Sequence, residues 1–239
     1  MKRRGRRNAL HKSPCNLDYR KAQGRESRMV QSDLLECPME PPTLRERRRD
    51  AILDAAEALF LEQGYERTSL AEIVKQSGGS LATLYDLFGN KQGLLHAIAS
   101  RWGNEARCQP AECMAVADLS NVELLRGYAH RQCDRMQSPR AIALMRMLIS
   151  ESLRDRDFAL QIYRDLHVPA IEELSALFAE WAAAGQAEID DPQAAAKLLL
   201  SIVIGDSMLH TLAGLEDEWL DNDQLDWRLQ PFLSHFKIV

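Results

Sequence analysis

Apolar residues recur at helical spacing along most of the chain from residue 43 onward, and no stretch shows the strict alternation of a half-buried strand. The first run has the i, i+3, i+4, i+7, i+8 pattern of one helix face and consists of Ile52, Ala55, Ala56, Leu59 and Phe60. Thr43 precedes Glu46 by three residues, as Ser69 precedes Glu72, which is the capping-box spacing that begins a helix. Gly64 is placed to end the first helix. The pattern therefore predicts an all-α fold.

The same periodicity along the rest of the chain predicts about nine helices. They are expected over residues 43–63, 69–76, 81–88, 91–107, 120–136, 138–153, 157–184, 191–213 and 222–236. Pro169 lies inside the seventh helix and is expected to kink or divide it, because proline lacks the N–H that a helix interior requires. No apolar run approaches the ~18 residues of a membrane-spanning helix, so we expect none to cross a bilayer.

Residues 1–42 lack this periodicity and are rich in Arg, Ser, Pro and Gly, which predicts a basic, disordered arm. No apolar segment follows the arginine cluster, and this argues against a secretory signal. Two other interpretations stay open. A transit peptide has a similar arginine-rich composition, and translation could begin instead at Met29 or Met39, both just before the first helix.

The formal net charge of −5, from 30 Lys and Arg against 35 Asp and Glu, by itself argues against a nucleic-acid partner. The charge is, however, sorted along the chain. Residues 1–40 hold ten basic and five acidic residues, residues 41–100 are nearly balanced, and residues 101–239 hold thirteen basic and twenty-two acidic residues. The total charge is therefore an average over unlike segments and says little about partners.

The clearest motif lies in residues 69–88, where two short predicted helices are joined by a turn, residues 77–79, with two glycines. This arrangement is a helix-turn-helix, whose second helix enters the major groove of DNA. The surrounding string AILDAAEALFLEQGYERTSLAEIVKQSGGSLATLYDLFGNKQGLL, residues 51–95, resembles the DNA-binding domain of the tetracycline-repressor (TetR) family of bacterial regulators. The matching positions are Ile52, Ala55, Ala56, Phe60, Gly64, Tyr65, Thr68, Ile73, Gly78, Thr83, Leu84, Tyr85, Phe88, Lys91 and Leu94.

The resemblance implies a three-helix DNA-binding domain over residues 43–101, and a helical bundle over residues 102–239 that binds a small ligand and forms a homodimer. It also implies that Lys91 binds a phosphate group. The expected function is a cytoplasmic, ligand-responsive repressor that binds a palindromic operator as a dimer. Two alternatives stay open: a regulator that activates or senses no small molecule, and an α-helical adaptor whose basic arm binds RNA or a protein.

The second helix of the motif has a face suited to base reading. On a helical wheel, Leu84 points inward while Ala82 and Asp86 point away from it. Thr83 and Tyr85 flank that face and offer hydroxyl groups, and a small Ala permits contact with a thymine methyl group. The free N–H groups at helix N-termini suit phosphates. The predicted DNA-binding residues are Arg47, Arg48, Thr68, Ser69, Ser80, Leu81, Ala82, Thr83, Tyr85, Asp86 and Lys91.

Three positions depart from the family pattern toward neutral or acidic side chains. Ala71 replaces a common Arg, Leu81 a polar or basic residue, and Asp86 a His. Leu81 and Leu87 could merely enlarge the small core, and Asp86 could accept a hydrogen bond from a cytosine amino group. Attraction to phosphate is then expected from the arm and the first helix, with a solvated helix start as the alternative. The cations there are Arg45, Arg47, Arg48 and Arg49.

Two apolar stripes in the last two helices predict a four-helix bundle between two copies of the chain, with intramolecular core as the alternative. The predicted interface residues are Leu198, Ile202, Gly205, Leu209, Leu225, Leu229, Phe232 and Phe236. Large or adaptable side chains of the middle helices are candidates for a ligand pocket, although ordinary core packing accounts for each of them as well. They are Trp102, His130, Cys133, Met145, Phe158, Tyr163, Phe178 and Trp181.

Residues 102–239 contain no recognisable catalytic spacing. The histidines are scattered, and no H-E-x-x-H, Walker or G-x-S-x-G string occurs. We therefore expect no enzyme activity, no cofactor and no metal site. The five cysteines form no C-x-x-C pair and are interpreted as reduced thiols, with a redox sensor as the alternative. The expected partners are double-stranded operator DNA, a second copy of the chain and a small-molecule effector.

Overall fold

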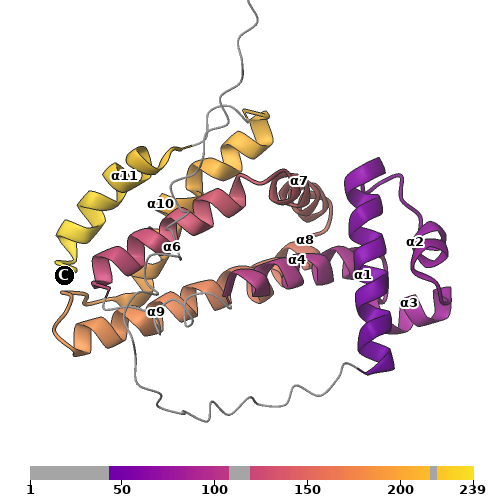
Figure 1. Ribbon diagram of the computed structural model, residues 1–239, viewed down its shortest axis with the longest axis horizontal. Coiled ribbons are helices and arrows are strands. Elements are labelled where there is room, and N and C mark those ends of the chain that lie inside the picture. Colours follow the sequence, from indigo (N-terminus) through magenta and orange to yellow (C-terminus); the bar gives the residue numbers. More distant parts are fainter. Residues whose placement is uncertain (1–42, 108–118, 216–219) are drawn as a thin grey trace, which may run out of the picture. The chain divides into compact units, whose positions relative to one another are not determined.

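The computed structural model describes residues 43–107, 119–215 and 220–239, and every regular element in these ranges is a helix. The first four are α1 (Leu44–Gln63), α2 (Leu70–Ser77), α3 (Leu81–Phe88) and α4 (Lys91–Arg107). The others are α6 (Asn121–Met136), α7 (Pro139–Arg154), α8 (Arg156–Ile162), η1 (Tyr163–His167), α9 (Val168–Ala183), α10 (Pro192–Ala213) and α11 (Asn222–His235) (Figure 1). The predicted all-α fold is confirmed. The predicted arm, residues 1–42, and four of the five cysteines lie outside the described residues.

Local side chains explain where most helices begin. Thr43 and Ser69 form the two predicted capping boxes with Glu46 and Glu72, and each hydroxyl accepts a hydrogen bond from the backbone N–H of its glutamate. At α11 the cap is Asp221, and the helix begins at Asn222, as the sequence predicted. Short-range hydrogen bonding of this kind is set by neighbouring residues, which is why the helix starts follow from sequence.

The long helix predicted over residues 157–184 is one continuous helical stretch, in which a π-helical turn lies just before Pro169. Asp155 caps a new helix, α8, and a π-helical turn, η1, then connects α8 to α9. Pro169 lies in the first turn of α9, where a missing N–H is tolerated. With the unbroken stretch from α8 to α9 taken as one, the described ranges contain the nine helices predicted.

Two hydrophobic clusters hold the described helices together. The reading-end cluster unites residues of α1 to α4, among them Ile52, Phe60 and Leu84, with Leu148 of α7 and Phe158 of α8. The distal cluster unites α6, α9, α10 and α11. Because α7 and α8 contribute to the reading-end cluster, the described residues form one compact unit. Functional domains that divide at residue 101, within α4, therefore stay a prediction.

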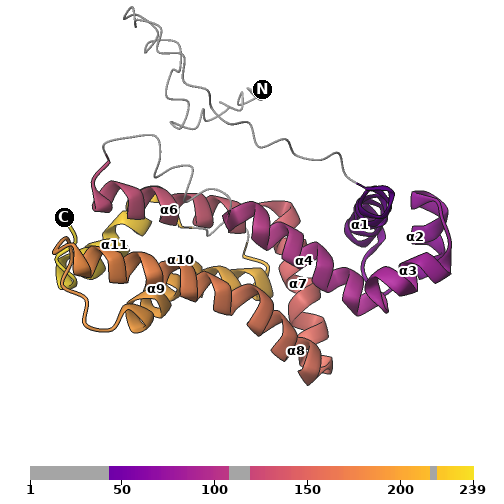
Figure 2. The same ribbon diagram turned by 90° about the horizontal axis from the view of Figure 1, so that it is seen from below.

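Helix α4 connects the two ends of this unit. It packs against α1 and α3 at one end and against α7 and η1 farther along (Figure 2). α10 packs most extensively on α9 and is, among the described helices, the one long and apolar enough to span a membrane. Its buried residues Ala196, Leu199 and Val203 belong to the distal cluster, whereas Leu209 and Leu212 are exposed, so α10 has one core face and one uncovered apolar face.

Candidate nucleic-acid interface

The exposed face of α3 consists of residues one helical turn apart. Leu81, Ala82, Tyr85 and Asp86 are exposed, whereas Leu84 is completely buried in the reading-end cluster. The helical wheel predicted that Leu84 points inward and that Ala82 and Asp86 point away from it. Leu87 is half-buried against the cluster, so it enlarges the core, but Leu81 remains on the exposed face. The face therefore offers an apolar group, a small residue, a phenol and one carboxylate to a groove.

The turn before α3 holds this face in place. Gly78 and Gly79 have φ values of +73° and +103°, which side chains with a Cβ rarely adopt. Ser80 then caps α3, because its hydroxyl accepts a hydrogen bond from the backbone N–H of Thr83 at 3.2 Å. The Thr83 hydroxyl also lies 3.0 Å from that of Ser80. This hydrogen bond restrains the side chains of both predicted DNA-binding residues.

Three arginines at the start of α1 lie against α3 and its preceding turn. The Arg45 guanidinium donates to the Asp86 carboxylate at 3.3 Å. The Arg48 guanidinium lies so close to Gly79 that a Cβ there would be 3.3 Å from its Nη1 atom. Arg49 is positioned over the Phe88 ring at 5.8 Å. The cations expected from the sequence therefore border the exposed face of α3, and Arg47 is also exposed on α1.

Thr68 and Ser69 occupy unlike environments. Thr68 is only 2% exposed and donates its hydroxyl hydrogen inward, to the backbone oxygens of Leu59 and Gly64. Its side chain therefore lies inside the structure and is not presented to a phosphate as the sequence suggested. Ser69 is exposed at the N-terminus of α2, where its hydroxyl is hydrogen-bonded to Glu72.

Lys91 is folded back onto the end of α1. Its ammonium donates to the backbone oxygen of Glu66 at 3.2 Å and lies 4.4 Å from the centre of the Tyr65 ring. Burial lowers the pKa of Lys91, and the carboxylates of Glu151 and Glu72 partly oppose this shift. Burial also raises the pKa of Tyr65, as does Glu151 of α7, to which its hydroxyl is hydrogen-bonded. Lys91, which was predicted to bind a phosphate, thus lies near a carboxylate from α7, a neighbour that sequence spacing does not reveal.

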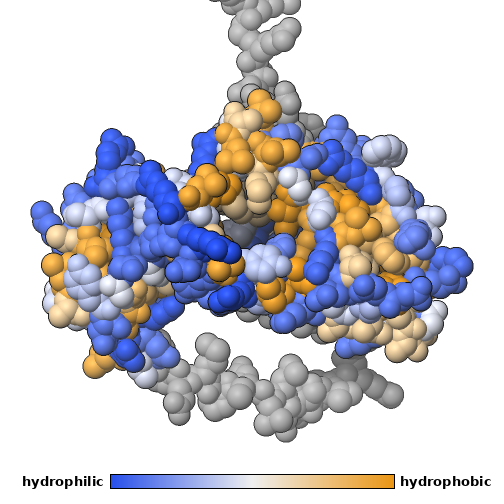
Figure 3. Space-filling view, turned by 180° about the vertical axis from the view of Figure 1, so that it is seen from behind, coloured by the Kyte–Doolittle hydropathy of each residue, from blue (hydrophilic) through white to orange (hydrophobic). Residues whose placement is uncertain are grey.

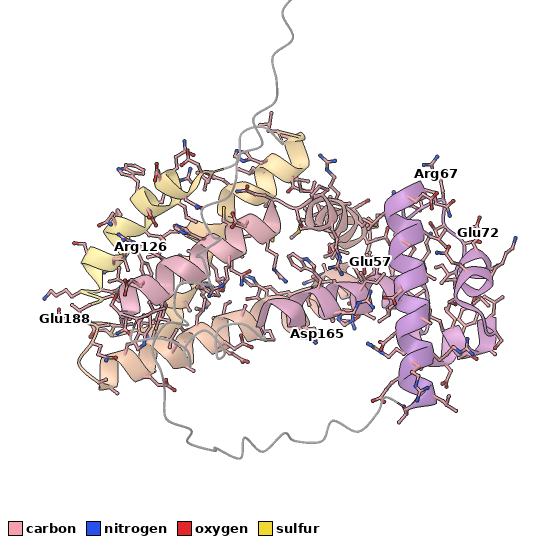
Figure 4. The ribbon with its side chains drawn as sticks, viewed as in Figure 1. Glu57, Arg67, Glu72, Arg126, Asp165 and Glu188 are labelled. Atoms are coloured by element: carbon pink, nitrogen blue, oxygen red, sulfur yellow. The ribbon has the colours of Figure 1, made fainter. Side chains whose placement is uncertain are left out.

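A second polar contact joins α1 to α4 and α7. The Glu57 carboxylate, 14% exposed, accepts hydrogen bonds from Arg101 of α4 at 2.7 Å and from Arg140 of α7. Glu57 lies on the side of α1 that faces α4, while Glu72 lies on the far side of α1 (Figure 4). Burial would raise the pKa of Glu57, but the hydrogen bonds from Arg140 and Arg101 hold it below its ordinary value. Glu57 was not predicted as a site residue.

The predicted interface residues separate into three groups, which are exposed, buried and partly buried. Leu198 and Leu209 of α10 are exposed, the latter to 64%, and Gly205 is exposed between them. Leu225, Leu229 and Phe232 of α11 are buried in the chain's own distal cluster. They therefore form part of the intramolecular core, which was the alternative to a dimer interface. Ile202 and Phe236 are partly buried against the same cluster.

The sequence did not single out all of the exposed apolar surface. Leu212 is exposed on α10 and Trp227 on α11, in addition to Met208 of the predicted α10 stripe. Apolar residues gather on the face seen in Figure 3. The uncovered apolar surface near the C-terminus therefore belongs mainly to α10.

The candidate pocket residues are not brought together. Cys133, Phe178 and Trp181 are buried in the distal cluster, but Phe158 belongs to the reading-end cluster and Tyr163 is half exposed. Burial raises the pKa of the Cys133 thiol, which favours the unreactive form. Met145 of α7 is partly buried.

The two remaining candidates, His130 and Trp102, each contact a charged side chain. The His130 ring is hydrogen-bonded to Asp226 at 2.9 Å, and the Trp102 ring stacks under the Arg135 guanidinium at 3.7 Å. A wide, open depression of about 580 Å³ lies elsewhere, between α10 and α11, and is lined by Asp206, His210, Leu220, Asp221, Asp223, Gln224, Trp227 and Arg228. No group of His, Cys, Asp and Glu in the described ranges could hold a metal ion.

Two separate family models match parts of the chain. Residues 52–98 match a family described as bacterial regulatory proteins, tetR family. Residues 123–230 match a family described as the C-terminal domain of AefR-like transcriptional repressors. The two matches do not overlap and are separated by residues 99–122, and they contain the helix-turn-helix and most of the helices after it.

Individual relatives agree with these matches. The HTH-type transcriptional repressor ComR of Escherichia coli is 50% identical over 54 residues, which are 23% of this chain and 26% of ComR. The chain thus spans about a quarter of the length of the curated relatives that it matches. The solved Flavonoid-responsive Regulator FrrA is 28% identical, with a TM-score of 0.60, over 79% of this chain and 96% of FrrA. A transcriptional regulator from Mesorhizobium loti, 20% identical, has the same fold, with a TM-score of 0.70 over 82% of this chain and 99% of that one.

Proposed function

Because this chain belongs to the tetR family of bacterial regulatory proteins, we propose that it is a cytoplasmic, ligand-responsive repressor that binds a palindromic operator as a homodimer. The observation that carries this proposal is the exposed face of α3, formed by Leu81, Ala82, Tyr85 and Asp86 and bordered by arginines of α1. A helix of this kind fits the major groove, and the neighbouring cations attract the phosphate backbone.

The uncovered face of α10 supports the dimer. Leu198, Met208, Leu209 and Leu212 are exposed on one helix, and water-exposed apolar surface of this extent favours association with a partner. Apart from the neighbouring backbone of α10 itself, no atom of the described residues lies within 4 Å of the position that a Cβ on Gly205 would occupy. A second helix could therefore approach α10 closely there. A two-fold axis beside α10 would present two copies of α3 to successive major grooves, about 34 to 36 Å apart.

The contacts of α7 support a response to a ligand. α7 contacts α1 through Arg140 and Glu57, and its Glu151 accepts a hydrogen bond from Gln92 of α4 at 3.2 Å. A ligand that shifts the helices around α7 would therefore act on the helices that carry the DNA-binding face. By population shift, it would disfavour the spacing that matches the operator.

Selection from a library of double-stranded DNA with two-fold symmetry tests this proposal. We expect the full-length protein to enrich one palindromic sequence and to bind it as a dimer. Failure to enrich any sequence, together with binding of RNA, would favour the α-helical adaptor.

A chain lacking residues 1–42 should bind the selected site with a shallower dependence on salt, because fewer phosphates are neutralised. An unchanged slope would exclude a role of the arm in binding.

A further inference from the structure

The recognition helix α3 carries a single charged residue, and its charge has the wrong sign for a polyanion. Of the eight residues from Leu81 to Phe88, only Asp86 is ionisable as an acid or base near neutral pH. Its side chain is 70% exposed on the same face as Ala82 and Tyr85. A carboxylate in this position would be repelled by DNA phosphates unless a cation accompanies it.

That cation is present in the structure. Arg45, 41 residues earlier and at the start of α1, places Nη2 3.3 Å from Asp86 Oδ2. Both side chains are about 70% exposed, and an exposed pair of this kind contributes little to the stability of a fold. The pair therefore has no evident structural purpose, but it neutralises the carboxylate locally.

The carboxylate keeps acceptor capacity for a further partner. An ionised carboxylate offers about four acceptor positions, and within the described ranges Arg45 is the one hydrogen-bond donor found at Asp86, on Oδ2. Ala82, one turn earlier on the same face, has almost no side chain to hold α3 away from the floor of a groove. Oδ1 thus keeps its acceptor positions for a further donor on this exposed face.

We propose that Asp86 is a specificity-determining residue that accepts a hydrogen bond from the N4 amino group of a cytosine, while Arg45 is its positioning residue. In the major groove, cytosine presents a donor, whereas thymine presents O4 and guanine presents O6 and N7, all acceptors that repel a carboxylate. Adenine presents a donor next to the N7 acceptor, which disfavours a second carboxylate oxygen. This inference rests on the proposed function, because it requires α3 to enter a major groove.

The test uses the full-length protein and a symmetric, randomised DNA duplex library, with sequencing of the bound fraction. Wild type should show a cytosine preference at one position in each half-site. Asp86→Ala and Asp86→Asn should reduce that preference by between about fivefold and a hundredfold and leave the other positions unchanged. Arg45→Ala should weaken the same preference, and Arg45→Lys should restore part of it, because the positive charge returns.

Asp50→Asn is the matched control. Asp50 is also an exposed carboxylate paired with an arginine, Arg49 at 3.9 Å, but it lies on α1 and not on α3. Its loss removes the same charge and should leave every base preference unchanged. A uniform gain of affinity for all sequences in Asp86→Ala, without loss of selectivity, would overturn the inference and identify Asp86 as a repulsive charge only.

The two proposals fail in different ways. If wild type enriches no sequence, the proposed function fails. If wild type enriches a palindrome and Asp86→Ala enriches the same one with equal selectivity, only the inference about Asp86 fails. Circular dichroism of each variant should match wild type, since both substituted side chains are exposed.

Discussion

The helices α3 and α10 both leave part of their surface uncovered, but they uncover different chemistry. α3 exposes Ala82, Tyr85 and Asp86, and arginines of a neighbouring helix border this face. α10 exposes Leu209 and Leu212. A mixed polar face bordered by cations suits a hydrated polyanion, whereas an aliphatic face suits another aliphatic face. The comparison is consistent with the two different partners proposed for these surfaces, operator DNA at α3 and a second copy of the chain at α10.

The largest expected effect concerns the uncovered face of α10. Leu209→Glu combined with Leu212→Glu would place two carboxylates in a closed apolar interface, at a cost of several kcal/mol for each ion. We expect the dimer to weaken by more than about a thousandfold. Light scattering at micromolar concentration should then report a monomer.

Leu153→Glu on α7, an even more exposed leucine outside α10, serves as control and should leave the dimer intact. A wild-type protein that is monomeric under the same conditions would contradict the assignment of α10 to the interface. Circular dichroism should show that the α10 double variant keeps its helix content.

A second prediction compares the two hydrophobic clusters. Phe178→Ala in the distal cluster and Phe60→Ala in the reading-end cluster each remove a buried ring, with an expected loss of about 3–5 kcal/mol in the free energy of unfolding. Because Leu148 and Phe158 connect α7 and α8 to the reading end, both variants should unfold in one transition. Urea denaturation followed by fluorescence and by circular dichroism tests this. Two separate transitions in Phe60→Ala would show that the reading end unfolds independently.

Loss of the contact that Glu57 of α1 makes with Arg101 and Arg140 should lower the free energy of unfolding by a smaller amount, about 1–2 kcal/mol. Since the folded-state pKa of Glu57 lies below its ordinary value of 4.5, its contribution is complete above that pH. It is lost as pH falls through the lower, folded-state pKa. Glu57→Gln should therefore be less stable than wild type at pH 7, and the difference should narrow in acid. Urea midpoints at pH 7 and at about pH 2.5 measure it, and a pH-independent difference would contradict the assignment.

The smallest expected effect concerns the cations beside α3. Arg48→Ala should weaken binding to all DNA sequences to a similar degree and reduce the slope of log affinity against log salt by about 1. Arg156→Ala on α8, an exposed arginine distant in sequence, should leave the slope unchanged. Equal slopes for Arg48→Ala and wild type would mean that Arg48 only supports the Gly78–Gly79 turn.

Much of the reading end followed from sequence because it depends on short-range interactions. The caps at Thr43, Ser69 and Ser80 and the burial of Leu84 all involve residues within a few positions of one another. The burial of Thr68 did not follow, because its hydroxyl bonds to Leu59, nine residues earlier, across the turn after α1.

The sequence by itself determined the helices, their caps, the helix-turn-helix and the outward face of α3, since periodicity and capping act between neighbours. Only the tertiary structure decided which apolar stripe is covered. The stripes of α10 and α11 have the same periodicity, yet Leu225 and Leu229 are inside while Leu209 is exposed. Periodicity shows that a face is apolar but does not say whether its own chain covers it. The pairing of Arg45 with Asp86 likewise depends on how α1 packs beside α3, which no local pattern specifies.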